Sequence, residues 1–434
     1  MIDRVGLLQA LVRIDTTNPP GNERAGIDLI ATHLAAGGID FELVAAQPDR
    51  PNLIARIPGR GAAPPLLLQG HIDVVPVTGQ RWARDPFGGD IAEGFIWGRG
   101  TLDMKGPVVM MLDALVRIAS DPTPPAGDLI FAVVADEEMQ GTVGARHLVS
   151  EHPQLFAGVR YALGEFGAFP FVFGDTRFYP IQIAERIGVG FELVIEGAGG
   201  HGSMPVRGGA MAKLGGILRA LDRRRLPIHI TPATAMMIQA LVANTTGPTR
   251  IALQRLADAR TAGTVLRGLS SRLGLFEPMF RNTVSPTVVR GGDAHNVIPE
   301  RITLGLDGRM LPGISIEEFE SEVRDVVGPD CQIRTITDGA TSPAEPDLGL
   351  FPLLSAALVE QDPLAVPIPF LLPAVTDGRW FAQLGIQPYG YTPITLPPGF
   401  DFQRTVHAAD ERIPLEALEF GSEVLYTVLR RYEG

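Results

Sequence analysis

The stretch from Leu66 to Gly106 reads LLLQGHIDVVPVTGQRWARDPFGGDIAEGFIWGRGTLDMKG and decides the fold. Its opening apolar run predicts a buried strand. His71 and Asp73 follow that run two residues apart, so their side chains point to the same side of an extended chain. Asp103 follows on a separate loop, before an apolar helical pattern. Imidazole and carboxylate groups are good ligands for a divalent metal such as zinc. The alternative is that His71 and Asp73 only pair with each other at a strand end.

Two further strands are also followed by acidic residues. The run LIFAVVA, residues 129–135, is typical of a central parallel strand, and Asp136, Glu137 and Glu138 follow it. Like charges beside an apolar strand are costly unless a cation compensates them, although the loop could instead turn into solvent. A strand at 161–163 leads to Glu165. The alternation of strands and helices predicts an α/β sheet with these acids at its carboxyl edge, where such sheets bind ligands.

Length and composition limit what the chain can be. Its 434 residues exceed what one core usually holds, which favours two domains. A net charge of −12 without a run of lysines or arginines argues against a nucleic-acid partner. Cys331 is the single cysteine, so neither an internal disulfide nor a thiolate metal cage is expected. Any metal must therefore be held by His, Asp and Glu.

The first residues predict an amphipathic helix rather than a signal peptide, because Val5, Leu8, Leu11 and Val12 lie at helical spacing without an uninterrupted apolar run. The longest apolar runs are also too short to span a membrane. We therefore expect a cytoplasmic protein that does not use a membrane as a partner.

The pattern changes near residue 181. Period-2 alternation over 179–196 predicts strands, helices fit 210–221 and 249–273, and strands fit 284–289 and 302–306. A helix at 316–327 then resumes the α/β pattern. We therefore predict a catalytic domain in two parts, residues 1–184 and 313–434, with an inserted α+β lid domain at residues 185–312.

Nine segments spread from about residue 14 to residue 411 together resemble one enzyme family, in order and in spacing. The segments are GHIDVVP, GRGTLDMKG, VVADEE, GEFG, GGHGSMP, NVIP, DGRMLPG, TDGRWF and HAADE. The family is that of the cocatalytic zinc amidohydrolases, which includes aminoacylase, carboxypeptidase G, acetylornithine deacetylase and succinyl-diaminopimelate desuccinylase. The resemblance implies a mixed, mainly parallel sheet flanked by helices, with a lid domain through which a homodimer forms.

The resemblance also implies the roles of seven residues in a centre of two zinc ions, with cobalt or manganese as substitutes. Asp103 would bridge the two metals, with His71 and Glu165 completing one site, Glu138 and His407 completing the other, Glu137 as general acid/base and Asp73 as the partner of His71. Bound cations polarise the scissile carbonyl and lower the pKa of a water. The resemblance further implies a cis peptide bond between Asp103 and Met104.

Four more residues are expected to act on the substrate. By resemblance, His201 in GGHGSMP would stabilise the tetrahedral oxyanion, often in a neighbouring subunit's site, although it could be an ordinary surface histidine. Asn296 and Arg309 resemble the pair that grips a substrate carboxylate, which suits the two-pronged guanidinium of arginine. Thr376 lies in a loop that borders the substrate pocket in the family, together with Asp377 and Arg379.

We therefore expect a hydrolase that cleaves an amide bond adjacent to a carboxylate, in an N-acyl amino acid or a small peptide. The alternatives are a biosynthetic desuccinylase or deacetylase, a metal-stabilised binding protein that has lost catalysis, and a purely structural, metal-stabilised oligomer. The helical stretch 249–273 resembles the longer branch of carboxypeptidase S-like and N-acyl-amino-acid hydrolases, and its extra helices could alter the mode of dimerisation.

Overall fold

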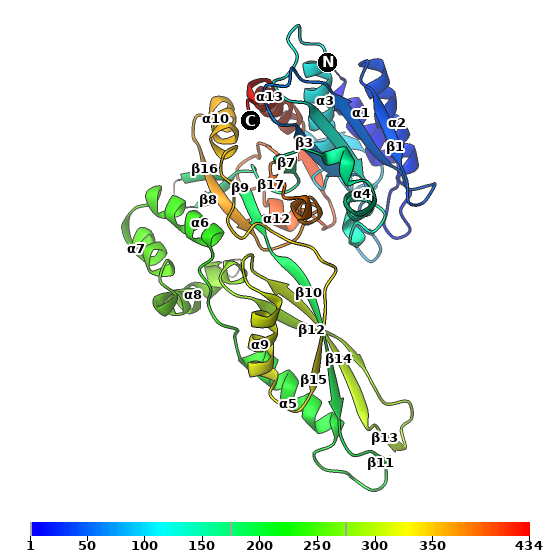
Figure 1. Cartoon of the computed structure of the whole chain (residues 1–434), viewed down its shortest axis with the longest axis vertical. Coiled ribbons are helices and arrows are strands. Elements are labelled where there is room, and N and C mark those ends of the chain that lie inside the picture. Colours follow the sequence, from blue (N-terminus) through cyan, green and yellow to red (C-terminus); the bar gives the residue numbers. More distant parts are fainter. Residues whose placement is uncertain (1, 174–175, 274–275) are drawn as a thin grey trace. The chain divides into compact units, whose positions relative to one another are not determined.

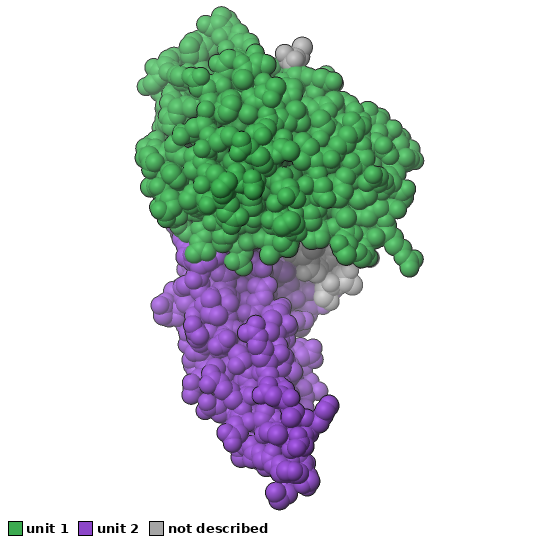
Figure 2. Space-filling model, turned by 90° about the vertical axis from the view of Figure 1, so that its right-hand side faces the viewer, with its two compact units in different colours: residues 1–183, 346–370, 376–434 green, residues 184–345, 371–375 purple. Residues whose placement is uncertain are grey.

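A computed structural model describes residues 2–173, 176–273 and 276–434. The chain forms two compact units (Figure 2). Unit 1 contains Met1–Ile183, Pro346–Phe370 and Thr376–Gly434, and unit 2 contains Ala184–Glu345 and Leu371–Val375. Segments from both ends of the sequence therefore build unit 1, and the middle of the chain builds unit 2.

The main sheet has the strand order β1-β2-β6-β3-β7-β17-β9-β16, with β8 paired to β9 (Figure 1). Its central strands β6, β3, β7 and β17 are parallel, which confirms the predicted mixed, mainly parallel sheet. The strands are β1 (Phe41–Val44), β2 (Asn52–Ile57), β3 (Leu66–His71), β6 (Leu129–Val134), β7 (Tyr161–Gly164), β8 (Phe171–Phe173), β9 (Thr176–Glu185), β16 (Ala365–Leu372) and β17 (Gln387–Gly390).

Strands β3 and β6 form the centre of this sheet because their apolar runs are buried along their whole length. His71 pairs with Val134 in register, and Leu68 pairs with Leu163. The carboxyl ends of β3, β6 and β7 therefore lie at one edge of the sheet. The polar residues that follow these strands are brought to that edge.

Helices of unit 1 pack around this sheet, and α3 is the most deeply buried of them because it is apolar nearly all round. It packs against β3, α1 and α13. The unit 1 helices are α1 (Arg4–Arg13), α2 (Arg24–Ala36), α3 (Lys105–Ala119), α4 (Ala145–Glu151), α10 (Phe351–Gln361), α11 (Gly378–Phe381), α12 (Phe402–Thr405) and α13 (Leu415–Arg431), with short 3-10 turns at Glu137–Met139, Pro153–Phe156 and Ala382–Leu384.

A small second sheet of unit 1 joins distant parts of the sequence. It has the order β18-β5-β4, from the strands β4 (Asp90–Ala92), β5 (Phe95–Trp97) and β18 (Arg412–Pro414). Because β18 pairs with β5, the segment before residue 412 lies beside the segment after residue 97. Strands β4 and β5 pair antiparallel as a hairpin, with Glu93 and Gly94 between them.

Unit 2 is built on an antiparallel sheet of order β12-β14-β10-β15, with a separate pair β11-β13. Its strands are β10 (Ile187–Glu196), β11 (Gly200–His201), β12 (Thr283–Arg290), β13 (Val297–Ile298), β14 (Arg301–Met310) and β15 (Gln332–Ile336). Helix α5 (Ala210–Arg223) contacts β10, β12 and β14, and α9 (Ile316–Val327) contacts α5 and β15. The other helical segments are α6 (Pro232–Ala243), α7 (Gly247–Leu256), α8 (Ala259–Leu273) and the 3-10 turn Glu277–Met279.

The structure corrects two sequence predictions in this unit. The helix expected over 249–273 is two helices, because Asp258 begins a new one: its side chain accepts the Arg260 N–H, and its carbonyl accepts those of Thr261 and Ala262. The predicted end of the insertion, residue 312, is too early. Strand β15 pairs with β10, so unit 2 extends to Glu345.

None of the described helices is long and apolar enough to cross a membrane.

A histidine holds α9 in unit 2. The His229 ring hydrogen bonds to one oxygen of the buried Glu322 carboxylate, and the Asn282 side chain donates to the other at 2.9 Å. Glu318 also lies nearby, so the His229 imidazole and the carboxylates of Glu318 and Glu322 are close enough to hold a metal ion. Both Glu322 oxygens are already used, however, so we interpret this cluster as structural.

The His229–Glu322 pair should make the stability of unit 2 depend on pH. The hydrogen bond to Glu322 raises the pKa of His229, burial and Arg281 oppose the rise, and Glu318 adds to it. The folded state then binds the proton more tightly than the unfolded chain, whose histidine pKa is about 6.5. The stabilisation is therefore complete below that pH and is lost as the pH rises through the folded pKa.

In scanning calorimetry, the difference in Tm between wild type and His229→Gln should shrink as the pH rises from about 6 to about 9. His33→Gln, an exchange at a histidine of α2 in unit 1, provides the control. A His229→Gln difference that is independent of pH would contradict the assignment.

Candidate metal centre

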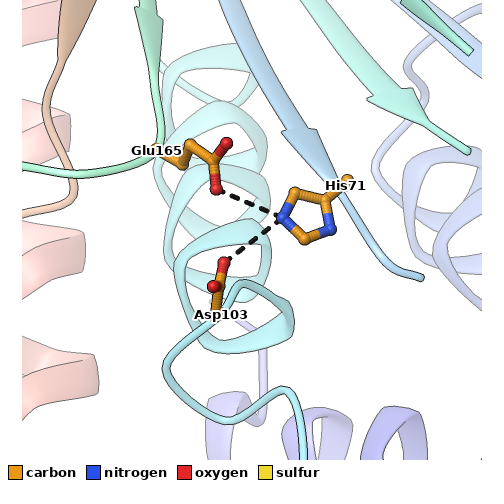
Figure 3. A group of neighbouring side chains, drawn as sticks. All are labelled: His71, Asp103 and Glu165. Atoms are coloured by element: carbon orange, nitrogen blue, oxygen red, sulfur yellow. Dashed lines mark hydrogen bonds and ion pairs between the residues drawn. The ribbon is translucent and has the colours of Figure 1, made fainter. Parts of the chain in front are cut away.

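Three of the predicted ligands meet at the carboxyl edge of the main sheet. His71 ends β3, Glu165 follows β7, and Asp103 lies in the loop before α3. Both carboxylates approach the same ring nitrogen, as Figure 3 shows: His71 Nε2 lies 3.3 Å from Asp103 Oδ1 and 3.2 Å from Glu165 Oε2. All three residues are buried.

The other oxygen of Asp103 belongs to a second group. Asp103 Oδ2 lies 3.1 Å from His407 Nε2, and Glu138 Oε1 lies 3.2 Å from the same nitrogen. Glu138 comes from the 3-10 turn that follows β6, and His407 comes from the loop between α12 and β18. The five predicted ligands thus form two groups that share Asp103.

The proton on His71 indicates why a cation fits the first group. Its Nδ1 lies 3.0 Å from the main-chain oxygen of Asp73, which can only accept, so Nδ1 must donate. In the neutral ring, Nε2 then carries a lone pair directed at two carboxylate oxygens. That arrangement is repulsive unless the ring gains a second proton or a cation binds between the three atoms.

The distances between ligand atoms support the same conclusion. Two ligand atoms that each lie about 2.0–2.2 Å from a tetrahedral zinc are about 3.3–3.6 Å apart. The four nitrogen–oxygen distances in the two groups, 3.1 to 3.3 Å, reach the lower limit of that range or lie within about 0.2 Å below it. Burial also raises the pKa of Glu165 and Glu138, because charged carboxylates are poorly solvated there and bound cations would compensate them.

Asp73 and Asn18 support the acidic turn after β6. The Asp73 carboxylate accepts the N–H groups of Glu137 and Glu138, each at 3.2 Å, and the Asn18 side chain at 2.8 Å. Asn18 also donates to Asp136 at 3.0 Å. The sequence analysis missed Asn18, since a polar residue before two prolines indicates only a loop.

Glu137 lies beside the first group without belonging to it. Its Oε2 is 3.9 Å from His71 Nε2, and its side chain is 10% exposed. Burial, reinforced by the charge of Glu165, raises the pKa of Glu137 well above its ordinary value. The bond between Asp103 and Met104 is cis, as the resemblance implied.

Thr376 and Asp377 lie in unit 1, and both are buried. The Thr376 hydroxyl accepts the Gly378 N–H at 3.0 Å at the start of α11. Neither carboxylate oxygen of Asp377 has a hydrogen-bond partner among the described residues. Burial raises the pKa of Asp377 to about 8, and Arg379 opposes the rise.

The remaining predicted residues lie in unit 2, and the structure brings only two of them together. His201 in β11 pairs with Val297 in β13, next to Asn296, and Gly202 donates its N–H to the Asn296 carbonyl at 2.8 Å. His201 Nδ1 accepts the Ser203 N–H at 3.2 Å, so the neutral ring carries its proton on Nε2 and can donate from there.

Arg309 is distant from Asn296 in the same chain. It lies near the end of β14, whereas Asn296 precedes the first residue of that strand, Arg301. The eight residues from Arg301 to Arg309 alone span about 26 Å of extended chain. Asn296 and Arg309 of the same chain therefore lie too far apart to contact one carboxylate group together, and Arg309 pairs with Asp307 at 3.1 Å. Their shared grip on a substrate carboxylate stays a prediction.

Comparison with known proteins identifies relatives along most of the chain. The model of peptidase family M20/M25/M40 matches residues 67–431. A probable carboxypeptidase S-like 2 of Dictyostelium discoideum is 26% identical over 402 residues, which cover 85% of this chain and 72% of that protein. The human N-fatty-acyl-amino acid synthase/hydrolase PM20D1 is also 26% identical, over 84% of this chain and 74% of that protein.

A more local similarity and a solved structure complete the comparison. Succinyl-diaminopimelate desuccinylase of Cereibacter sphaeroides is 42% identical over 147 residues, which cover 33% of this chain and 37% of that protein. The M20 family metallo-carboxypeptidase Sso-CP2 of Sulfolobus solfataricus has the same fold, with a TM-score of 0.70 at 15% identity over 100% of both chains.

Removing divalent ions should destabilise unit 1. A site saturated at 100 times its Kd adds about 2.7 kcal/mol to the free energy of unfolding. We expect Tm to fall after treatment with a chelator and to recover when Zn²⁺, Co²⁺ or Mn²⁺ is restored. Asp103→Asn should abolish most of this recovery, because Asp103 belongs to both groups.

Asp28→Asn, at an exposed ion pair on α2, should retain the full recovery and serves as the control. A Tm of wild type that is indifferent to divalent ions would count against the metal centre.

Proposed function

The chain belongs to peptidase family M20/M25/M40, whose members are metal-dependent hydrolases, and we propose that it cleaves an amide bond next to a carboxylate by means of two metal ions. The single observation that supports this proposal best is the sharing of Asp103 between two groups of ligand atoms. A carboxylate that bridges two cations holds them a few ångströms apart, as cocatalytic hydrolysis requires.

Zinc is the metal we propose, with cobalt or manganese as substitutes. His71 and Glu165 would complete one site, and Glu138 and His407 the other. Each group combines one imidazole with carboxylates, a set that accepts several divalent ions. When bound, these ions supply Lewis-acid polarisation of the scissile carbonyl and a lower pKa for a water.

The proton transfers fall to Glu137. Its carboxylate is 3.9 Å from His71 Nε2, which is beyond hydrogen-bond distance, so it is available to act on the attacking water. Glu137 would take a proton from that water and give it to the leaving nitrogen. The Asp73 carboxylate accepts a hydrogen bond from the main-chain N–H of Glu137. The main-chain carbonyl of Asp73 accepts one from His71 Nδ1 and thereby fixes the orientation of the imidazole ring.

Names of the relatives suggest the substrate class. Relatives that align with most of this chain include a carboxypeptidase S-like protein and a hydrolase of N-fatty-acyl amino acids. We therefore propose an N-acyl amino acid or a small peptide as the substrate. Arg309 would contact its carboxylate. His201 and the adjacent Asn296 would contact its reacting carbonyl and its carboxylate from a second copy of the chain, in a homodimer formed through unit 2. The predicted binding role of Thr376 stays a hypothesis. A cytoplasmic location also stays a prediction.

The second candidate, a succinyl-diaminopimelate desuccinylase, is favoured by the 42% identity over 147 residues. A hydrolysis screen separates the two candidates. We expect N-acyl amino acids or dipeptides, tested with added Zn²⁺, Co²⁺ or Mn²⁺, to give kcat/KM at least about tenfold above that of N-succinyl-diaminopimelate, a difference of about 1.4 kcal/mol in transition-state binding. The reverse order would establish the desuccinylase instead.

Glu137→Gln tests the mechanism. Removal of a general acid/base costs about 10²–10⁴-fold in rate, so kcat should fall by that amount. Metal content, measured by atomic emission, should stay at the wild-type value because Glu137 is not a proposed ligand. Glu151→Gln, on the exposed surface of α4, is the matched control. Retained turnover in Glu137→Gln would refute the assigned role, and absence of turnover in wild type would favour a binding protein.

A further inference from the structure

The two groups of ligands differ in how firmly the fold holds them. His71 and Glu165 are buried and lie at the ends of adjacent paired strands, β3 and β7. His407, by contrast, lies in a loop, and its side chain is 49% exposed. It must nevertheless stay within reach of Asp103, which is 304 residues earlier in the sequence. Interactions outside the main sheet must therefore fix the distance between His407 and Asp103.

Glu411 fixes the Asp103 loop. Its Oε1 accepts the N–H groups of Leu102 at 2.8 Å and of Asp103 at 3.2 Å. Its Oε2 forms an ion pair with Arg99 Nη1. Arg99 and Glu411 are both almost completely buried, so neither can exchange its partner for water. Removing one partner of such a buried ion pair strongly destabilises the folded protein, because the other charge is left buried without compensation.

Gln80 connects this ion pair to His407. Its Oε1 accepts from Arg99 Nη2 at 2.8 Å and from Trp82 Nε1 at 3.1 Å, while its Nε2 donates to the His407 carbonyl at 2.8 Å. Only this orientation of the amide satisfies all three partners, because Arg and Trp can only donate and a carbonyl can only accept. The Gln80 amide therefore has one allowed orientation.

An unbroken series of hydrogen bonds thus runs from the main chain of Asp103 through Glu411, Arg99 and Gln80 to the main chain of His407. We propose that Gln80, Arg99 and Glu411 are positioning residues that set the separation of Asp103 and His407. They thereby determine the affinity of the cation position formed by Asp103, Glu138 and His407. This inference rests on the proposed two-metal centre, and it adds that the second position depends on both ends of this series, because His407 belongs to that position alone.

Gln80→Glu tests the proposal with little change in shape. The new carboxylate can still accept from Arg99 and Trp82, but it cannot donate to the His407 carbonyl and repels it. We expect Co²⁺ titration of metal-free protein, followed by calorimetry and visible absorption, to show two binding steps in wild type. In Gln80→Glu one step should weaken about 10- to 100-fold, the usual cost of losing a group that supports a ligand. The other step should change by less than about threefold.

Gln9→Glu is the matched control, because Gln9 also donates to a main-chain carbonyl, that of Gly89, at 2.7 Å in a different part of unit 1. Both its Co²⁺ steps should equal those of wild type. Glu411→Gln is the second variant; since it disturbs a buried ion pair, its metal-free Tm is measured first. When it folds, it should weaken the step that Gln80→Glu weakens and also the other step, because Glu411 holds Asp103, which belongs to both groups.

Two results would overturn the proposal, and they differ in what else they overturn. If wild type binds two Co²⁺ ions and Gln80→Glu binds both unchanged, or loses both equally, the positioning role is wrong while the proposed function stands. If wild type binds fewer than two ions, the two-metal function itself fails, and the positioning role fails with it.

Discussion

The concentration of buried acid at one sheet edge is the constraint on which the rest of the structure depends. Among the described residues, Asp103, Glu138 and Glu165 lie within contact distance of two imidazoles, and their own side chains are at most 8% exposed. Uncompensated charges at such a place would cost several kcal/mol each. The fold tolerates them because the parallel strands β3, β6 and β7 all end there, so ligands from separate segments can be held around cations.

Around this edge the fold provides two kinds of support. Main-chain pairing of parallel strands fixes His71 and Glu165, and the acidic turn after β6 is held by Asp73 and Asn18. The loops that bear Asp103 and His407 do not adjoin strands of the main sheet. The pairing of β18 with β5 in the small β18-β5-β4 sheet brings these loops together. Polar side chains then fix their separation. Under the proposed two-metal centre, such an arrangement would let one cation position differ from the other in affinity although both share Asp103.

Much of this could be predicted from the sequence because it rests on local patterns. Strand β6, helix α9 and the buried α3 follow from apolar runs and periodicity, and the family resemblance supplied the ligand set. Asn18 and Gln80 could not be found in this way, since their partners lie far away in the sequence and their types are ordinary in loops. The extent of unit 2 was not predicted correctly, because the sequence of a helix such as α9 indicates which face is apolar but not which sheet that face packs against. The separation of Asn296 from Arg309 likewise depends on the register of β14, which no local pattern gives.

The most direct measurement of the central claim is anomalous X-ray diffraction from crystals grown with Zn²⁺ and collected on both sides of the zinc absorption edge. The account predicts two anomalous peaks in each chain, one against His71 and Glu165 and one against Glu138 and His407, with Asp103 between them. A single peak, or two peaks that do not share Asp103, would contradict it.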